Sequence, residues 1–150
     1  MGNPPSPPLL ILDTSVVLKW FLEKGEADLV EARRIREAFL SGRCALGAPD
    51  LLLIEVANAL TAGHRASPKE VSETIATILE IGIQLFEIQF AALVKAVEIA
   101  STYGLAVYDT YFLAVAIEAG GLLVTADEVV LRKIKTHVRV TSLRGFRLED

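Results

Sequence analysis

The chain has 150 residues, of which 52% are hydrophobic, a net charge of −4 and a single cysteine. This length suits one domain with a sizeable core, and one cysteine excludes both a disulfide framework and a set of thiolate metal ligands. No apolar run reaches the roughly 18 residues of a membrane-spanning helix, so we expect a cytoplasmic protein without a membrane partner. The acidic balance counts against binding nucleic acid by net charge alone.

The first half of the chain alternates between predicted strands and helices. Residues 1–8 are rich in proline and predict a flexible tail, ahead of one domain that spans residues 9–150. An apolar run at 9–12 indicates a buried strand, and Asp13-Thr14-Ser15 is typical of the start of a helix, here over 16–21. The patterns that follow predict a helix at 26–40, a strand at 44–47, a helix from about 50 to 62, and a helix opened by Ser67-Pro68 with Glu70 as its capping-box acid.

The second half continues this alternation. It predicts a strand at 83–88, a helix to about residue 103, a helix that begins near Asp109 and ends at Gly120-Gly121, a strand at 122–125, a short helix at 126–133 and a strand at 137–141. Short apolar strands that alternate with helices are typical of the α/β class. We therefore expect a central parallel sheet of about five short strands, flanked by helices on both faces.

Two acidic residues follow predicted strands directly. Asp13 comes after the first strand, and Asp127 lies just past the fourth. In open α/β sheets, ligands bind outside the carboxyl ends of the strands. Each residue also suits an ordinary capping role at the start of a helix. Together, however, Asp13 and Asp127 are expected at the same edge of the sheet. The pair is therefore more informative than either residue alone, and indicates a shared site.

Two further carboxylates stand alone in apolar segments. Glu55 lies within LLLIEVANAL, and Asp109 lies within LAVYDTYFLAVA. A helix this apolar is usually buried, and a buried carboxylate needs a cation, a hydrogen-bond partner or a metal ion. Asp109 could instead be a first-turn acid, but Glu55 falls in mid-helix, where capping does not explain it. Asn58, about one turn further on, shares the face of Glu55.

Four carboxylates in one pocket would repel one another and raise their pKa values unless cations were bound. Oxygen-rich sites suit hard ions such as Mg²⁺ or Mn²⁺, which can activate water and orient a phosphodiester. Thr14, Ser15 and Thr125 could donate hydrogen bonds to the carboxylates or to a phosphate, although capping and turn roles fit them as well.

Four segments in chain order resemble the PIN-domain family, and within it the VapC-type toxins of toxin–antitoxin pairs. The segments are Asp13-Thr14-Ser15 after a strand, the helix around Glu55-Val56-Ala57-Asn58, Tyr108-Asp109 opening an apolar helix, and Leu123-Val124-Thr125-Ala126-Asp127. Together they cover roughly residues 9–141. Each segment alone is weak, and their order within one α/β chain makes the resemblance fairly specific.

The resemblance implies a metal-dependent endoribonuclease that acts as the toxin of such a pair. It implies an RNA substrate, bound Mg²⁺ or Mn²⁺, a homodimer and a cognate antitoxin whose C-terminal segment blocks the site. It also implies that catalysis and metal binding rest on Asp13, Glu55, Asp109 and Asp127, with support from Thr14, Ser15, Asn58 and Thr125. Asp127 is the least secure of the acids, because Glu128 is an adjacent competitor.

Other readings fit the residues less well. A phosphatase of the haloacid dehalogenase type needs a second Asp two residues after the first, where this chain has Ser15. A metal-free ribonuclease would use paired histidines, and the chain has only His64 and His137. The main alternative is a PIN-like module that binds RNA or protein with little or no cleavage.

Overall fold

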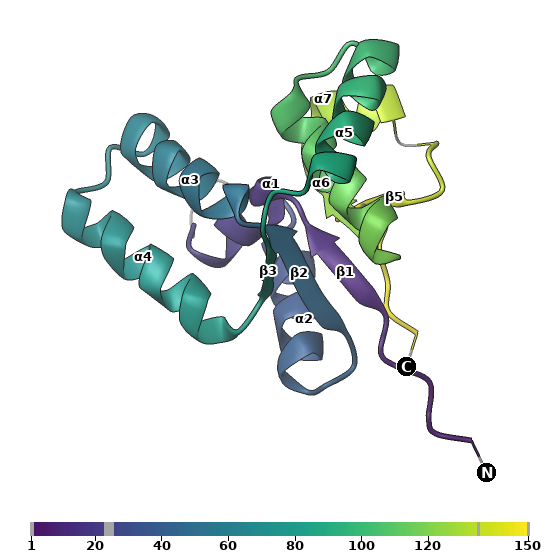
Figure 1. The fold of residues 1–150 in the computed structure, drawn as a ribbon. Coiled ribbons are helices and arrows are strands. Elements are labelled where there is room, and N and C mark those ends of the chain that lie inside the picture. Colours follow the sequence, from purple (N-terminus) through teal and green to yellow (C-terminus); the bar gives the residue numbers. More distant parts are fainter. Residues whose placement is uncertain (1, 23–25, 135, 150) are drawn as a thin grey trace.

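The computed structural model describes residues 2–22, 26–134 and 136–149. Helices and strands alternate along the chain in the expected order (Figure 1). The elements are β1 (Leu9–Leu12), α1 (Thr14–Val17), the 3-10 helix η1 (Leu18–Trp20), α2 (Leu29–Leu40), β2 (Ala45–Pro49), α3 (Leu51–Asn58), the π-helix η2 (Ala59–Gly63), α4 (Pro68–Ile81), β3 (Gln84–Phe86), α5 (Phe90–Tyr103), α6 (Val107–Ala119), β4 (Leu122–Thr125), α7 (Glu128–Ile134) and β5 (Val140–Ser142). None of the helices in the described ranges is long and apolar enough to span a membrane.

The strands form one sheet in the order β3-β2-β1-β4-β5, and every neighbouring pair is parallel. Ile11, in the central strand, pairs with Gly47 on one side and Leu123 on the other. The chain runs outward from β1 to β3 and then returns to add β4 and β5 on the opposite side. This reversal places a topological switch point, a common ligand position, between the carboxyl ends of β1 and β4. The predicted α/β class with a five-stranded parallel sheet is confirmed.

Several predicted boundaries differ from the observed ones, among them those of α2, β5 and β3. Helix α2 begins at Leu29 rather than at residue 26, because Asp28 adopts a left-handed backbone conformation, with φ of 61°. Strand β5 begins at Val140 rather than 137, since a turn closed by the amide of Val140 on the His137 carbonyl (3.0 Å) comes first. Strand β3 is shorter than the apolar run at 83–88 predicts. The first two differences arise from local backbone geometry that an apolar pattern does not encode.

Helix α6 is the central helix of the core. Seven consecutive residues, from Thr110 to Ala116, are buried, as expected of a helix that is apolar on every side. It packs against β1, β2 and β4 on one face of the sheet, together with α5, while α2 lies behind the strands (Figure 1). The first turn of α6 carries Asp109, so the burial of this helix fixes the position of that carboxylate relative to the sheet.

A buried hydrogen bond joins α6 to α5 next to Asp109. The Thr110 hydroxyl is fully buried and donates to the Ala96 carbonyl at 2.7 Å. The bond connects two helices at the turn that presents the carboxylate, and therefore restricts how far this turn can move from the sheet.

We expect Thr110→Val to lower the free energy of unfolding by about 1 kcal/mol, because valine keeps the shape but loses a buried hydrogen bond. Urea unfolding measures this change. Thr102→Val is the matched control, since the Thr102 hydroxyl donates to the Glu98 carbonyl on the exposed surface of α5. Equal losses in the two variants would show that the α5–α6 bond has no special role.

A candidate metal centre at the carboxyl edge of the sheet

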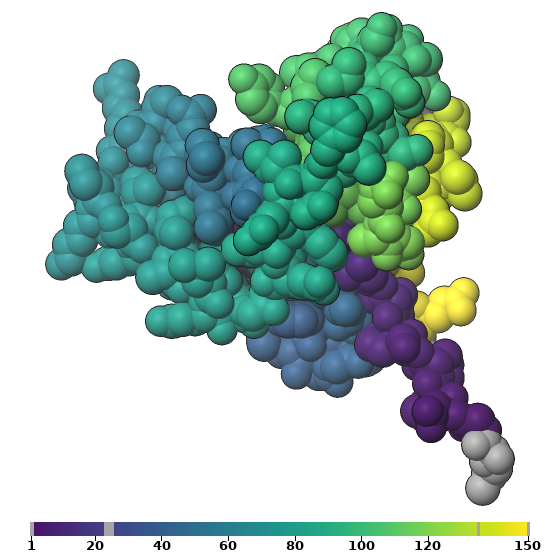
Figure 2. Space-filling view, in the orientation of Figure 1, coloured from purple at the N-terminus to yellow at the C-terminus, as the bar shows by residue number. Residues whose placement is uncertain are grey.

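Four acidic side chains from separate segments line one pocket of about 520 Å³. They come from the residue after β1, the middle of α3, the first turn of α6 and the residue two positions after β4, and are Asp13, Glu55, Asp109 and Asp127. The surface is hollowed between α3 and the α5–α6 pair (Figure 2). The structure thus brings together all four acids that the sequence singles out, at the switch point of the sheet.

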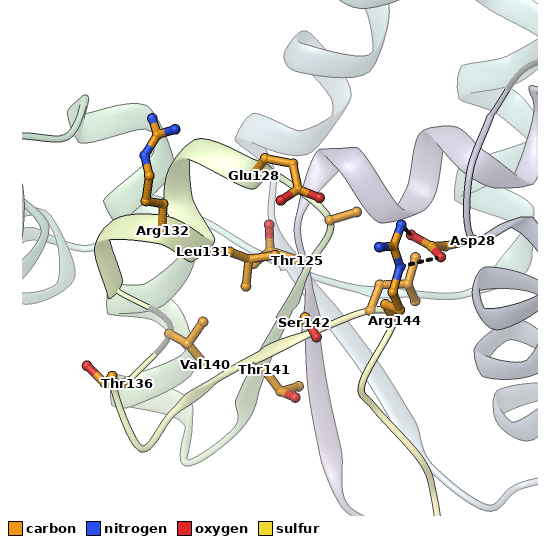
Figure 3. Close-up of a pocket in the computed structure, with 12 residues that line it drawn as sticks. Asp28, Thr125, Glu128, Leu131, Arg132, Thr136, Val140, Thr141, Ser142 and Arg144 are labelled. Atoms are coloured by element: carbon orange, nitrogen blue, oxygen red, sulfur yellow. Dashed lines mark hydrogen bonds and ion pairs between the residues drawn. The ribbon is translucent and has the colours of Figure 1, made fainter.

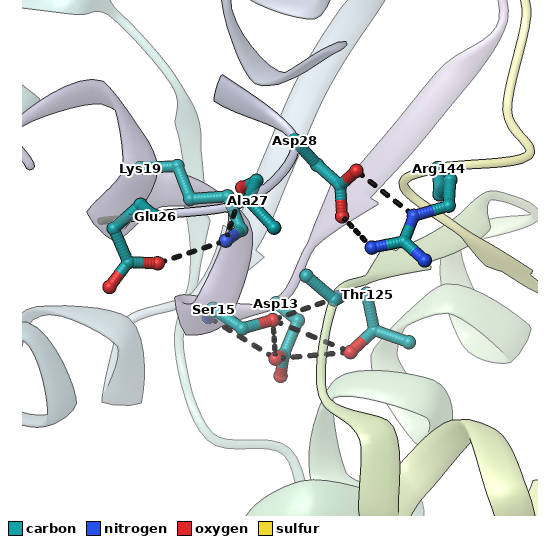
Figure 4. Close-up of polar contacts among 9 residues, drawn as sticks. Asp13, Ser15, Lys19, Glu26, Ala27, Asp28, Thr125 and Arg144 are labelled. Atoms are coloured by element: carbon teal, nitrogen blue, oxygen red, sulfur yellow. Dashed lines mark hydrogen bonds and ion pairs between the residues drawn. The ribbon is translucent and has the colours of Figure 1, made fainter. Parts of the chain in front are cut away.

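Asp13 is the buried member of the group. It is the N-cap of α1, and one carboxylate oxygen, Oδ2, accepts hydrogen bonds from the Ser15 amide (3.2 Å), the Ser15 hydroxyl (2.5 Å) and the Thr125 hydroxyl (3.2 Å; Figure 4). Burial raises the pKa of Asp13, and these hydrogen bonds offset only part of that rise. The capping role and the site role therefore coexist in this residue.

Asp127 likewise combines a cap with a place in the pocket. Its Oδ1 accepts hydrogen bonds from the amides of Val129 (2.8 Å) and Val130 (3.0 Å) at the start of α7. Its own amide donates to the Thr125 hydroxyl at 3.1 Å. The neighbouring Glu128 lines a different pocket, so the structure favours Asp127 as the fourth acid.

Glu55 is the least satisfied of the four carboxylates. Its Oε2 accepts a hydrogen bond from the Thr14 hydroxyl at 3.0 Å, whereas Oε1 is buried without a partner among the described residues. The pKa of Glu55 is raised to about 7, mainly by burial, with smaller contributions from the charges of Asp13, Asp109 and Asp127, while the Thr14 hydrogen bond lowers it. A buried carboxylate oxygen without a partner is well suited to coordinate a cation.

Asp109 faces the same pocket from α6. Its pKa is raised by burial and then by the charges of Asp127 and Asp13. Asn58, one turn beyond Glu55, also lines the pocket and places an amide beside the carboxylates. Asn58 therefore adds a neutral hydrogen-bonding group to the lining of an otherwise acidic pocket.

The donor set fits a divalent cation. Three of the carboxyl groups have raised pKa values, and one buried carboxylate oxygen has no hydrogen-bond partner among the described residues. A bound cation would offset the repulsion between the carboxylates and would coordinate that oxygen. Within the described ranges, no group of three or more His, Cys, Asp or Glu side chains is arranged so that it could hold a metal ion without some movement. The arrangement is a shared acidic pocket rather than a preformed coordination sphere.

Sequence reasoning missed several pocket residues. Ile54 and Tyr108 each precede one of the acids, line the pocket and are 69% and 67% exposed. Their position in the sequence, each a large side chain directly before a lone carboxylate, could have identified them as pocket residues. The amide of Ala126, which donates to the Ser15 hydroxyl at 3.0 Å, could not have been found, because backbone groups leave no mark on a sequence.

A parallel α/β sheet with an acidic pocket at its switch point defines a general class of candidate metal-dependent domains. The sequence comparison assigns the chain within that class: the PIN domain family model matches residues 10–136. The chain therefore belongs to the PIN domain family. A comparison with curated proteins gives no match.

Solved structures share the fold at low sequence identity. A toxin–antitoxin complex from Klebsiella pneumoniae is 16% identical with a TM-score of 0.65, covering 89% of this chain and 97% of the other. A protein from Pyrobaculum aerophilum is 20% identical with a TM-score of 0.64, covering 92% of each chain. VapC20 of Mycobacterium tuberculosis, a toxin that cleaves the sarcin–ricin loop, is 18% identical with a TM-score of 0.57, covering 75% of this chain and 84% of the other.

We expect Glu55→Gln to stabilise the metal-free protein above neutral pH. The pKa of Glu55 is about 7 in the folded protein, above its ordinary value of 4.5. Protonated Glu55 therefore stabilises the folded state fully below pH 4.5, and this contribution is lost as the pH rises from 4.5 through 7. Glutamine does not titrate, so the variant's melting temperature minus that of the wild type should increase between about pH 5 and about pH 8.

Thermal unfolding in EDTA measures this difference. Glu80→Gln, on the exposed surface of α4, is the matched control and should show no such trend. A Glu55→Gln difference that stays constant across the pH range would mean that Glu55 does not gain its charge over that interval.

Proposed function

We propose that the protein is a metal-dependent endoribonuclease that hydrolyses RNA phosphodiester bonds, and that it is the toxin of a toxin–antitoxin pair. The observation that supports this most directly is the convergence of four carboxylates on one pocket, with a buried oxygen of Glu55 left unpaired. Membership of the PIN domain family and a fold shared with a toxin that cleaves the sarcin–ricin loop support the same proposal.

In this proposal Mg²⁺ or Mn²⁺ is held by carboxylate oxygens of Asp13, Glu55, Asp109 and Asp127. The ion would lower the pKa of water and orient the phosphodiester for in-line attack. The chain itself fixes the carboxylates: Thr125 and Ser15 orient Asp13, and Thr14 orients Glu55. Such neighbouring hydrogen bonds are often needed for metal affinity.

Two further groups would act on protons and substrate. With a pKa of about 7, the Glu55 carboxyl group is partly protonated at neutral pH, and its proton would have to leave when a cation binds. The Asn58 amide lines the same pocket and can donate to a phosphate oxygen without adding charge. RNA would therefore meet an acidic centre whose charge is balanced by bound metal.

The partners and domain limits belong to the same proposal. A cognate antitoxin would block the site, as suggested by similar structures that are toxin–antitoxin complexes, including a VapBC complex from Salmonella typhimurium bound to DNA. We assign the nuclease domain to residues 9–150, preceded by a tail at 1–8, and place the protein in the cytoplasm.

The decisive experiment is cleavage of a mixed RNA pool by purified protein with Mg²⁺ or Mn²⁺. EDTA should abolish cleavage, and Asp13→Asn should lower the rate at least about 100-fold, because the loss of a charged metal ligand removes several kcal/mol of transition-state stabilisation. Asp50→Asn is the matched control: Asp50 also follows a strand at the carboxyl edge but does not line the pocket.

Cleavage that survives both EDTA and Asp13→Asn would contradict the metal mechanism. Metal binding in calorimetry without cleavage of any RNA would instead favour the alternative, a PIN-like module that binds RNA or protein without cutting.

A homodimer is the proposed assembly, and α5 offers the surface for it. The exposed fractions of Phe90, Leu93, Val94 and Val97 are 82%, 38%, 41% and 50%. Their spacing of three and four residues puts them on one side of the helix. A contiguous apolar stripe of this kind usually marks a protein interface, and a second copy would cover it with a matching stripe.

Light scattering tests this assembly. We expect the wild type at twice the chain mass and Val94→Glu at the mass of one chain, because a buried charge at the centre of the stripe is costly. Leu40→Glu, at a site 68% exposed at the end of α2, should leave the dimer intact. A monomeric wild type, or a Val94→Glu variant that still forms dimers, would rule out this interface.

A further inference from the structure

A second pocket lies beside the acidic one, between β5, α7 and the turn at Asp28 (Figure 3). Its volume of about 690 Å³ exceeds the 520 Å³ of the acidic pocket and falls in the range of small-ligand sites. We call it the β5 pocket, and its polar lining includes Asp28, Thr125, Glu128, Arg132, Ser142 and Arg144. None of these residues except Thr125 belongs to the proposed metal centre.

Thr125 forms the wall between the two pockets. Its buried hydroxyl donates to Asp13 on one side, at 3.2 Å, while the residue lines the β5 pocket on the other. The turn after β4 then separates two adjacent acids, because Asp127 lines the acidic pocket and Glu128 lines the β5 pocket. The two pockets are therefore neighbours on either side of the turn between β4 and α7.

The charges of the β5 pocket cancel. Its lining includes two acids, Asp28 and Glu128, and two arginines, Arg132 and Arg144. The Arg144 guanidinium donates to both carboxylate oxygens of Asp28, at 3.0 and 3.2 Å, so this pair is already satisfied (Figure 4). In the described part of the chain, Glu128 and Arg132 form no close ion pair, although the charge of Glu128 also acts on Arg144. The Glu128 carboxylate therefore keeps oxygen atoms that can accept hydrogen bonds from a ligand.

This chemistry suits an uncharged polar group rather than a phosphate. The hydroxyls of Thr136, Thr141 and Ser142 add small hydrogen-bonding groups to the lining. A balanced pocket gives a phosphate little net attraction, whereas a base and a ribose present both donors and acceptors. The site next to a phosphodiester-cleaving centre therefore has the character expected of a nucleoside pocket.

We propose that the β5 pocket holds the base and ribose of a nucleotide adjacent to the scissile phosphate of single-stranded RNA, with Glu128 contacting the base edge. This inference rests on the proposed nuclease function. An ionised carboxylate accepts hydrogen bonds and donates none. Glu128 therefore favours adenine, cytosine and guanine, whose amino groups offer two hydrogens, over uracil, whose base edge offers only the N3 imino hydrogen.

Sequencing the cleavage ends of a randomised single-stranded RNA pool tests the proposal. The wild type should disfavour uracil at one position beside the cut, and Glu128→Gln should relax this preference about 5- to 10-fold, because an amide offers both a donor and an acceptor. Glu80→Gln on α4 is the matched control and should keep the wild-type pattern. Metal dependence should be the same in all three proteins.

A second variant tests the pocket without changing Glu128. Thr141→Trp fills the pocket from edge strand β5, where an aromatic side chain suits the strand, and thermal unfolding checks the fold. In an Asp13→Asn background, it should weaken binding of the same RNA pool in fluorescence anisotropy. Arg33→Trp, at an exposed position on α2, is the control for a surface tryptophan.

The outcomes separate the two proposals. If the wild type cleaves the pool but shows no base preference beside the cut, or if both pocket variants match the wild type, the β5 pocket does not contact RNA and the nuclease function stands. A wild type that neither cleaves nor binds the pool overturns both.

Discussion

Placing a carboxylate at the end of the central strand is the constraint on which the site depends. Asp13 follows β1, which has a parallel strand on each side, so its side chain is shielded from water. Burying such a group is costly unless hydrogen bonds or a cation compensate. Hydrogen bonds from Ser15 and Thr125 supply part of this compensation, and the Thr125 bond also ties the end of β4 to the end of β1.

The other acids increase this cost instead of relieving it. Repulsion between like charges contributes to the raised pKa values of Asp13, Glu55 and Asp109. The buried helix α6 holds Asp109 in the pocket, and the hydroxyl of Thr14 holds Glu55 there. The apolar core thus holds together groups that repel one another. Active sites commonly show this opposition between stability and function.

Part of this site was predictable from the sequence because strand ends and lone carboxylates leave a clear pattern. The alternation of elements predicts the parallel sheet, and the sheet brings Asp13 and Asp127 to one edge. The direction of Glu128 was not predictable, since it depends on the turn after β4. The exposure of Phe90 was not predictable either, since aromatic residues usually pack in the core, whereas this one is 82% exposed at the first position of α5.

The turn between Thr125 and α7 has a consequence for how this chain can change over evolutionary time. Surface connections usually tolerate insertions and deletions. Here Ala126 donates to Ser15, and the next two residues point into different pockets, so the length of the turn sets which acid each pocket receives. Substitutions at Glu128 can alter one pocket alone, whereas a single inserted residue would disturb both at once. Diversification should therefore proceed by residue replacement in this turn, with its length held constant.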